Sequence, residues 1–255
     1  MQFLPNVSRR CNRRELMDEP QLPKNRLIEA LRGLERINWW SGSAGILWPP
    51  IRTLARESSY RPLRLLDVAS GAGDLPIRLW RKARRADINL RVAGCDLNPQ
   101  AVDFARRQAA QKSSDVHFFA CDATAGNFGA DYDVVVSSLF LHHLEDDQAI
   151  CLLQAMARAA RRLVLVNDLV RSRAGYLLAY SGTRFLSASD VVHSDGPLSV
   201  ERAFTIEEVT RLAQEAGLAG CKIERRWPCR FLLSWHRPER LSEKGSDPLT
   251  DAQKS

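Results

Sequence analysis

The spacing of hydrophobic residues along this chain changes near residue 60. Upstream, the segment from Asn25 to Asn38 places apolar residues three and four positions apart, which predicts an amphipathic helix. The stretch 39–43 interrupts that pattern, and a second short helix is expected after Pro50. From Leu63 onward, short apolar runs alternate with segments of helical spacing. The pattern therefore predicts N-terminal helices followed by an α/β domain.

The alternating region contains five strand-like runs in its first hundred residues and two more near its end. The predicted strands are 63–68, 90–95, 116–120, 132–137, 163–166, 221–225 and 231–235. The helices expected among them are 75–85, 99–111, 146–160 and 205–217, the last opened by a capping box from Thr205 to Glu208. Strands separated by helices of 10–15 residues predict a doubly wound α/β fold with a mostly parallel sheet.

Three boundaries follow from these patterns. Residues 1–60 are expected to form a helical cap, and 61–236 the main domain. Within it, 170–204 is too long for a simple connection and mixes aromatic residues with Gly and Ser, so we interpret it as a lid insertion over the substrate. The polar tail 237–255 is predicted to be disordered.

Composition narrows the class of protein without deciding it. The net charge is +7 and the pI about 9.3, but the arginines are spread along the chain, so a nucleic-acid partner is not favoured. No apolar run is long enough to span a membrane, and no secretory signal is recognisable, so we expect a cytoplasmic protein. The six cysteines form no C-x-x-C pair, which argues against structural zinc.

The segment from Leu65 to Asp74 carries the main functional signal, because it joins the first strand of the α/β region to its helix. Gly71 and Gly73 allow a tight turn and a close approach of the backbone to a ligand. The helix that follows presents free backbone amides, and this is where open α/β sheets bind nucleotides. The loop lacks G-x-G-x-x-G and so does not fit a nicotinamide dehydrogenase well, and the absence of G-K-[ST] excludes a P-loop.

Two acidic residues strengthen this interpretation. Asp96 ends the second strand, at the spacing where a carboxylate accepts both hydroxyl protons of a ribose. The alternative is a capping residue before Pro99. Asp122 follows the third strand and could accept from an adenine amino group, with Ala123 leaving room for the ring; a simple turn explains it equally well. Together, the three loops predict an adenosine-bearing cofactor.

These residues resemble the first motif of the class I S-adenosylmethionine-dependent methyltransferase superfamily, D-x-G-x-G-x-G, with Ala69 in place of the first glycine. The resemblance covers about residues 60–236. It implies a Rossmann-like, seven-stranded sheet with an antiparallel hairpin at one side. It also implies that S-adenosyl-L-methionine is the cofactor, with its methionine end on the loop. The cofactor-binding residues so assigned are Asp67, Ala69, Gly71, Gly73, Asp96, Leu97, Asp122, Ala123 and Ser138.

The segment 137–144 is similar to the motif after the fourth strand in small-molecule methyltransferases, including ubiquinone and menaquinone C-methyltransferases. The segment 195–204 resembles bacterial methyltransferases of phenolic and polyketide products. This branch implies methyl transfer to a phenolic, quinone-like or polyketide acceptor. The alternatives are a nucleic-acid methyltransferase, motivated by the pI but lacking [DN]-P-P-[YF] after strand four, and a non-catalytic cofactor-binding module.

Histidine is a suitable base near neutral pH, so His143, beside His142, is the first catalytic candidate. His193 in the insertion and Asp168 after the fifth strand are further candidates. Packing and capping are the structural alternatives for all of them. No metal-ligand motif stands out, so we expect metal-independent chemistry in a monomer or homodimer. The identity of the acceptor and the atom that is methylated stay open.

Overall fold

The computed structural model describes residues 7–19, 21–57, 61–129 and 132–238. Within these ranges a seven-stranded sheet forms the centre, in the order β3-β2-β1-β4-β5-β7-β6, and β7 is the strand that runs antiparallel to its neighbours. The strands are β1 (Leu63–Val68), β2 (Leu90–Asp96), β3 (Val116–Ala120), β4 (Tyr132–Ser138), β5 (Ala160–Leu169), β6 (Lys222–Arg226) and β7 (Arg230–His236). The predicted fold class and its antiparallel hairpin are confirmed.

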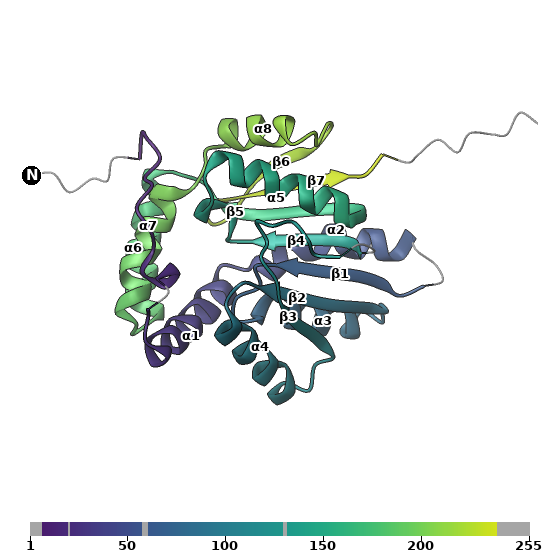
Figure 1. The fold of residues 1–255 in the computed structure, drawn as a ribbon, viewed down its shortest axis with the longest axis horizontal. Coiled ribbons are helices and arrows are strands. Elements are labelled where there is room, and N and C mark those ends of the chain that lie inside the picture. Colours follow the sequence, from purple (N-terminus) through teal and green to yellow (C-terminus); the bar gives the residue numbers. More distant parts are fainter. Residues whose placement is uncertain (1–6, 20, 58–60, 130–131, 239–255) are drawn as a thin grey trace, which may run out of the picture.

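Helices cover both faces of this sheet, as Figure 1 shows. The helices of the described residues are α1 (Lys24–Trp40), α2 (Ser43–Glu57), α3 (Asp74–Arg85), α4 (Pro99–Gln111), α5 (Asp146–Ala159), α6 (Arg173–Leu186), α7 (Asp190–Arg202) and α8 (Ile206–Glu215), with short 3-10 turns η1 (Leu16–Asp18) and η2 (Leu141–His143). None of the helices in the described ranges combines the length and the apolar character that crossing a bilayer requires.

The alternation of side chains along the strands builds two separate cores. Leu66 and Val135 point to the face that is covered by α5 and α8. Their neighbours Leu65 and Val134 point to the opposite face, where α2, α3 and α4 pack. Successive strand residues face opposite sides of a sheet, so strands that are buried on both faces are apolar throughout. This three-layer arrangement fixes the carboxyl ends of the parallel strands at one edge.

The segment 170–204, to which the sequence pattern assigned no regular element, forms α6 and α7. These two helices and α1 gather at the edge where the parallel strands end (Figure 1). Glycines allow the close packing: a Cβ on Gly33 would lie 2.3 Å from the Ser187 hydroxyl, and one on Gly196 would lie 2.3 Å from a Thr183 methyl group. The two helices expected in residues 1–60 pack in different places. Helix α2 packs on the sheet, whereas α1 packs beside α6 and α7.

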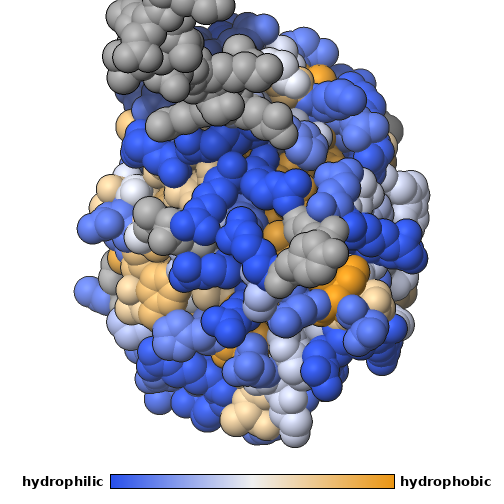
Figure 2. Space-filling model, turned by 90° about the vertical axis from the view of Figure 1, so that its right-hand side faces the viewer, coloured by the Kyte–Doolittle hydropathy of each residue, from blue (hydrophilic) through white to orange (hydrophobic). Residues whose placement is uncertain are grey.

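The polar tail that the sequence predicts to be disordered lies almost wholly outside the described residues, which end at 238. At the other end, residues 7–19 form a segment that we call the strap. It crosses the carboxyl edge of the sheet, where Cys11 donates a backbone hydrogen bond to the carbonyl of Glu201 on α7. The face at the right-hand end of Figure 1, shown in Figure 2, lies away from this edge and is mostly hydrophilic.

Candidate functional site

A cavity of about 1200 Å³ lies at the carboxyl edge of the sheet. Its wall includes the loop after β1, the ends of β2 and β3, η2, the strap, and one side of α1 and of α6. The predicted site residues in the wall are Ala69, Gly71, Asp96, Leu97, Asp122, Ala123, Ser138 and His143. Single-ligand pockets measure about 300–1,000 Å³, so this cavity has room for two small molecules side by side.

The loop after β1 adopts a backbone that glycine favours. Gly73 has φ of 75°, and a Cβ there would lie 2.6 Å from the Phe118 ring, so packing also requires glycine. Gly71 has φ of 51° and a Cβ on it would meet open space. Ala69 takes φ of 57° despite its methyl group, which costs on the order of 1 kcal/mol. The loop therefore keeps its shape at the position where alanine replaces the first glycine of the motif.

Asp67, in β1 just before this loop, is almost completely buried and is not among the residues that line the cavity in the described structure. Its Oδ1 atom has no hydrogen-bond partner among the described residues. Burial, with the nearby carboxyl groups of Asp74 and Asp96, raises the pKa of Asp67 well above its usual value. A buried acceptor without a partner is costly. A cationic amino group would both satisfy that oxygen and favour its ionised form.

Asp96 is held by two backbone amides. Its Oδ2 accepts from Gly71 at 2.8 Å and its Oδ1 accepts from Asn98 at 2.9 Å. Burial raises its pKa. The N-cap of α4 is Asn98, whose side chain accepts from the Gln100 amide, but the bond from the Asn98 amide to Asp96 leaves a structural role for Asp96 before Pro99 open. Leu97, beside Asp96, is 67% exposed and offers an apolar surface to the cavity.

Asp122 and Ser138 complete the rim of the cavity. Asp122 Oδ1 accepts from the hydroxyl and the amide of Thr124, and the Thr124 hydroxyl is the main reason that its pKa is lowered. This geometry leaves the turn interpretation of Asp122 open. Ser138 ends β4, and its hydroxyl accepts from Asn167 at 2.8 Å. Ala123 is buried beside Asp122.

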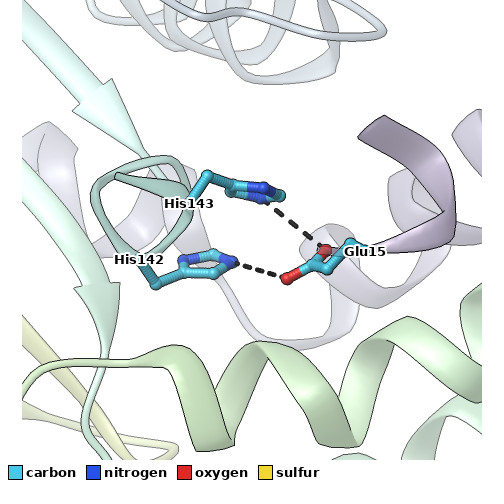
Figure 3. Close-up of side chains that lie close together, drawn as sticks. All are labelled: Glu15, His142 and His143. Carbon is cyan, nitrogen blue, oxygen red and sulfur yellow. Dashed lines mark ion pairs between the residues drawn. The ribbon is translucent and has the colours of Figure 1, made fainter. Parts of the chain in front are cut away.

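Opposite this rim, two histidines of η2 meet three carboxyl groups from distant segments. His142 Nδ1 lies 2.7 Å from Asp168 Oδ1, and the Asp168 carboxylate also accepts from the backbone amides of His142 and Leu169. His143 Nδ1 lies 2.9 Å from Asp18 Oδ2. Glu15, from the strap, faces both rings (Figure 3). Asp168 thus positions His142 and does not itself line the cavity in the described residues.

The charges around His143 decide its protonation in this arrangement. Burial alone would lower its pKa, but Glu15 and Asp18 outweigh burial and raise the pKa to about 9. His143 is therefore a hydrogen-bond donor and a positive charge at neutral pH unless another cation takes the place of its proton. The sequence identified the histidine pair but missed Glu15 and Asp18, which lie more than 120 residues away along the chain.

His193 lies elsewhere. His193 lies in the first turn of α7, and its Nε2 is 2.8 Å from the carbonyl oxygen of Ser187, which precedes that helix. It is not among the residues that line the cavity in the described structure. The geometry thus gives the catalytic hypothesis for His193 no support and fits its packing role.

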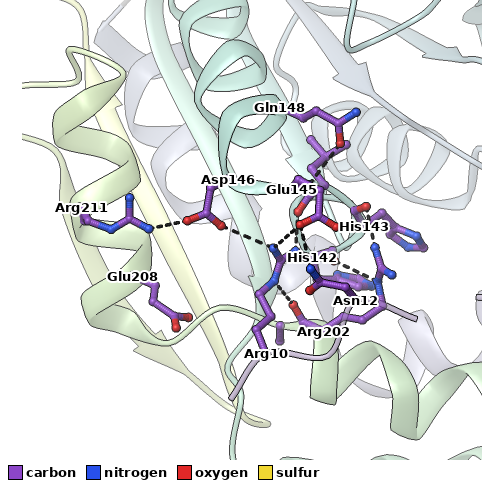
Figure 4. A network of polar contacts seen from close by, with 12 residues as sticks. Arg10, Asn12, His142, His143, Glu145, Asp146, Gln148, Arg202, Glu208 and Arg211 are labelled. Atoms are coloured by element: carbon purple, nitrogen blue, oxygen red, sulfur yellow. Dashed lines mark hydrogen bonds and ion pairs between the residues drawn. The ribbon is translucent and has the colours of Figure 1, made fainter. Parts of the chain in front are cut away.

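Arginines hold the strap over the site (Figure 4). Arg10 donates to the carbonyl of Arg202 at 2.6 Å and to those of His142 and Leu144, while its guanidinium lies 3.5 Å from Asp146. Arg202 donates to the backbone carbonyls of His142 and His143 at 3.2 and 2.7 Å. These contacts fix η2, and with it the histidine rings, against the strap. No periodic pattern of residues predicted this network.

The rest of the cavity forms a chamber with a largely apolar lining, and the buried Arg230 lies in its wall. Its apolar lining comes from α1 and α6 and includes Leu27, Leu31, Leu34, Ile37, Leu178 and Leu186. Arg230 of β7 is buried there, and its guanidinium donates to the hydroxyls of Ser43 and Ser41 at 2.5 and 2.6 Å. Burial lowers the pKa of Arg230 to about 10.

Comparison with known families identifies the region that carries the predicted motifs. Residues 65–162 match the family model described as a methyltransferase domain. This stretch of the chain is similar to a methyltransferase domain. This finding confirms the resemblance on which the cofactor interpretation depends. The match includes the loop after β1, Asp96, Asp122 and the histidine pair.

Two curated relatives share sequence with part of this chain. The demethylmenaquinone methyltransferase of Deinococcus radiodurans is 31% identical over 119 residues, which are 46% of this chain and 48% of that protein. The demethylmenaquinone methyltransferase of Thermus thermophilus is 32% identical over 108 residues, 42% of this chain and 47% of that protein. The chain spans about half the length of the curated relatives it matches.

Solved structures share the fold at lower identity. The S-adenosylmethionine-dependent methyltransferase SibL in its apo form superimposes with a TM-score of 0.61 and 22% identity, covering 89% of this chain and 63% of that one. Magnesium protoporphyrin IX methyltransferase from Synechocystis PCC 6803, crystallised with SAH, gives a TM-score of 0.54 and 18% identity, covering 77% of this chain and 84% of that one. At these identities the likeness concerns the fold.

Proposed function

We propose that this protein transfers a methyl group from S-adenosyl-L-methionine to a small phenolic, quinone-like or polyketide acceptor. One observation carries the proposal: the loops after β1, β2 and β3 line a single cavity, and just before the first of them the buried Asp67 has a carboxyl oxygen without a hydrogen-bond partner among the described residues. The methyltransferase domain and the relatives named as demethylmenaquinone methyltransferases support it.

The residues around the loops fit the parts of this cofactor. Asp67 would accept from the amino group, and the turn at Ala69, Gly71 and Gly73 brings the backbone close to the methionine end. Asp96, oriented by two amides, would accept from the ribose hydroxyls. The remaining contacts would come from Leu97, Asp122, Ala123 and Ser138. The cofactor supplies an electrophilic methyl group on a sulfonium.

The chamber beside this subsite supports the proposed class of acceptor. Its apolar side from α1 and α6 suits a ring or an alkyl chain, and His142 and His143 face it with polar atoms. Holding the acceptor in line with the methyl group supplies much of the rate acceleration in such reactions. His143 is the residue proposed to meet an acceptor hydroxyl, with Asp168 positioning its neighbour His142. The strap covers the chamber, which favours a small molecule over a polymer.

The cofactor subsite is tested by calorimetry with S-adenosylhomocysteine. Replacing Asp96 with Ala removes two charge-assisted hydrogen bonds, so we expect Asp96→Ala to weaken binding by about 10- to 100-fold. Asp103→Ala, at an exposed position on α4, is the matched control and should bind as the wild type does. Unchanged affinity in Asp96→Ala would contradict the proposed subsite.

The acceptor class is tested by transfer of a labelled methyl group. A panel of phenols, quinone precursors and RNA is incubated with the protein, and products are identified by mass. We expect label in a phenolic or quinone-type product. Label in RNA would support the nucleic-acid alternative instead, and cofactor binding without transfer to any acceptor would support a non-catalytic module.

A further inference from the structure

Three polar side chains from two distant segments converge on one point in the chamber wall (Figure 3). His142 Nε2 lies 3.6 Å from Glu15 Oε1, and His143 Nε2 lies 3.7 Å from Glu15 Oε2. One ligand-type atom from each of the three residues falls within 4.8 Å of the other two. Separations of 3.6–3.7 Å are too long for hydrogen bonds. They are close to the roughly 3.4 Å between two ligands of a tetrahedral ion with bonds of about 2.0–2.1 Å.

The opposite nitrogens of both rings are held by carboxylates. His142 Nδ1 donates to Asp168 at 2.7 Å, and His143 Nδ1 donates to Asp18 at 2.9 Å. These bonds fix each ring and, in a neutral imidazole, place the lone pair on Nε2. Metal-binding histidines are oriented by a carboxylate in this way. Glu15 is fixed as well, because its Oε1 accepts from the Ser199 hydroxyl at 2.8 Å.

The arrangement leaves acceptor atoms facing one another. Glu15 and His142 are each less than 5% exposed, so water screens their interaction poorly. When both rings are neutral, two Nε2 lone pairs and a carboxylate point at one place and require a positive charge between them. In the metal-free protein the proton on His143 supplies that charge, and a metal ion would take its place. We propose that Glu15, His142 and His143 form a binding site for a divalent transition-metal ion such as Zn²⁺. Two imidazoles and one carboxylate suit this class of ion, whereas Mg²⁺ and Ca²⁺ prefer sites made of oxygen atoms.

Three protein ligands leave a coordination position open, which is typical of catalytic and not structural metal sites. All three residues line the cavity proposed to hold the acceptor. The open position would therefore receive an acceptor oxygen, such as a phenolic hydroxyl, and hold it beside the methyl donor. This role rests on the proposed function; the metal site itself does not. The proposal replaces the expectation of metal-independent chemistry drawn from the sequence.

The site is tested on the full chain without cofactor or acceptor. The protein is stripped with a chelator, dialysed and titrated with Co²⁺, which reports its coordination through visible absorption, and with Zn²⁺ by calorimetry. We expect one equivalent of each ion to bind. The visible spectrum of bound Co²⁺ should be that of an ion with few ligands, all of them nitrogen or oxygen. Zn²⁺ should raise the unfolding temperature. A parallel titration with Mg²⁺ should show no saturable binding.

Variants separate the ligands from the residue that positions them. Glu15→Gln and His143→Gln should each weaken Co²⁺ binding at least about 100-fold. Asp18→Asn, which removes the partner of His143 Nδ1, should weaken it about tenfold while keeping the shape of the spectrum. His117→Gln, an exposed histidine on β3, is the matched control and should bind as the wild type does. Circular dichroism checks that each variant is folded.

Each outcome decides the matter. Saturable binding that is lost in Glu15→Gln and His143→Gln but kept in His117→Gln supports the site. Absence of Co²⁺ and Zn²⁺ binding in the wild type overturns it and assigns the positive charge in the cluster to a proton. Equal binding by wild type and folded Glu15→Gln also overturns it. Metal binding without methyl transfer to any acceptor would support the metal site and contradict the proposed function. A failure of the metal site can therefore be distinguished from a failure of the proposed function.

Discussion

At the scale of single residues, the acidic groups of the proposed cofactor subsite lower the stability of the folded protein. Asp67, Asp74 and Asp96 carry buried carboxyl groups close to one another, and burial is the main reason that the pKa of each is raised. Ionising such a buried acid destabilises the folded state, although Arg78, 3.9 Å from the Asp74 carboxyl group, offsets part of that cost at Asp74. A ligand with an amino group would offset that cost at Asp67. The buried acids of this loop therefore lower the free energy of unfolding of the ligand-free protein and favour binding of a ligand with a cationic group.

Asp74 provides a measurable case of this cost. Burial raises its pKa to about 6, compared with 3.8 for the unfolded chain. The ionised group therefore costs up to about 3 kcal/mol above pH 6, and the cost falls away between pH 6 and pH 4 as the folded state takes up its proton. We expect Asp74→Asn to raise the free energy of unfolding at pH 7.5, with a gain that shrinks toward pH 4. Urea unfolding of the ligand-free protein across this range measures it.

Asp103→Asn is the control, because Asp103 is exposed on α4. It should show no gain that depends on pH in this range. A gain in Asp74→Asn that stays constant between pH 4 and pH 7.5, or a loss of stability at pH 7.5, would contradict the assigned cost.

At the scale of elements, the sequence predicted most of the α/β domain and missed the helices over the site. β1, β3 and α4 have the predicted bounds, because their apolar spacing is regular. β5 is longer than predicted, since its polar ends, such as Asn167 and Asp168, are buried against β7. In α6 and α7, glycines and an internal Pro197 conceal the helical pattern. Those glycines allow close contacts between helices, and such contacts cannot be predicted from a single sequence.

Gly196 tests whether these contacts position the chamber. A Cβ there would lie 2.3 Å from a Thr183 methyl group on α6, so Gly196→Ala should force the helices apart and cost about 1–3 kcal/mol of unfolding free energy. Gly182→Ala is the matched comparison in α6, because a Cβ there meets no atom within 4 Å. It should be neutral or stabilising by up to about 1 kcal/mol. Equal losses in the two variants, measured by urea unfolding, would contradict the packing argument.

At the scale of the whole molecule, the strap joins parts of the site that the sequence presents as unrelated. The Asp195 carboxylate accepts from the backbone amides of Leu16 and Met17 at 2.9 and 3.0 Å, and this anchors the strap on α7. Glu15 is thereby brought to the histidines of η2. Acidic residues after strands were predictable, because parallel strands end at one edge. The contacts of the strap could not be predicted, because the strap has no periodic pattern and its partners are distant in the sequence.

The central claim is that three loops of one sheet edge hold a sulfur-bearing nucleoside beside a covered chamber. The most direct test is a crystal structure of the protein with S-adenosylhomocysteine. The account predicts the amino group within hydrogen-bond distance of Asp67, the ribose hydroxyls on Asp96 and the sulfur facing the chamber. Binding of the nucleoside elsewhere, or an unoccupied cavity at saturating ligand, would contradict it.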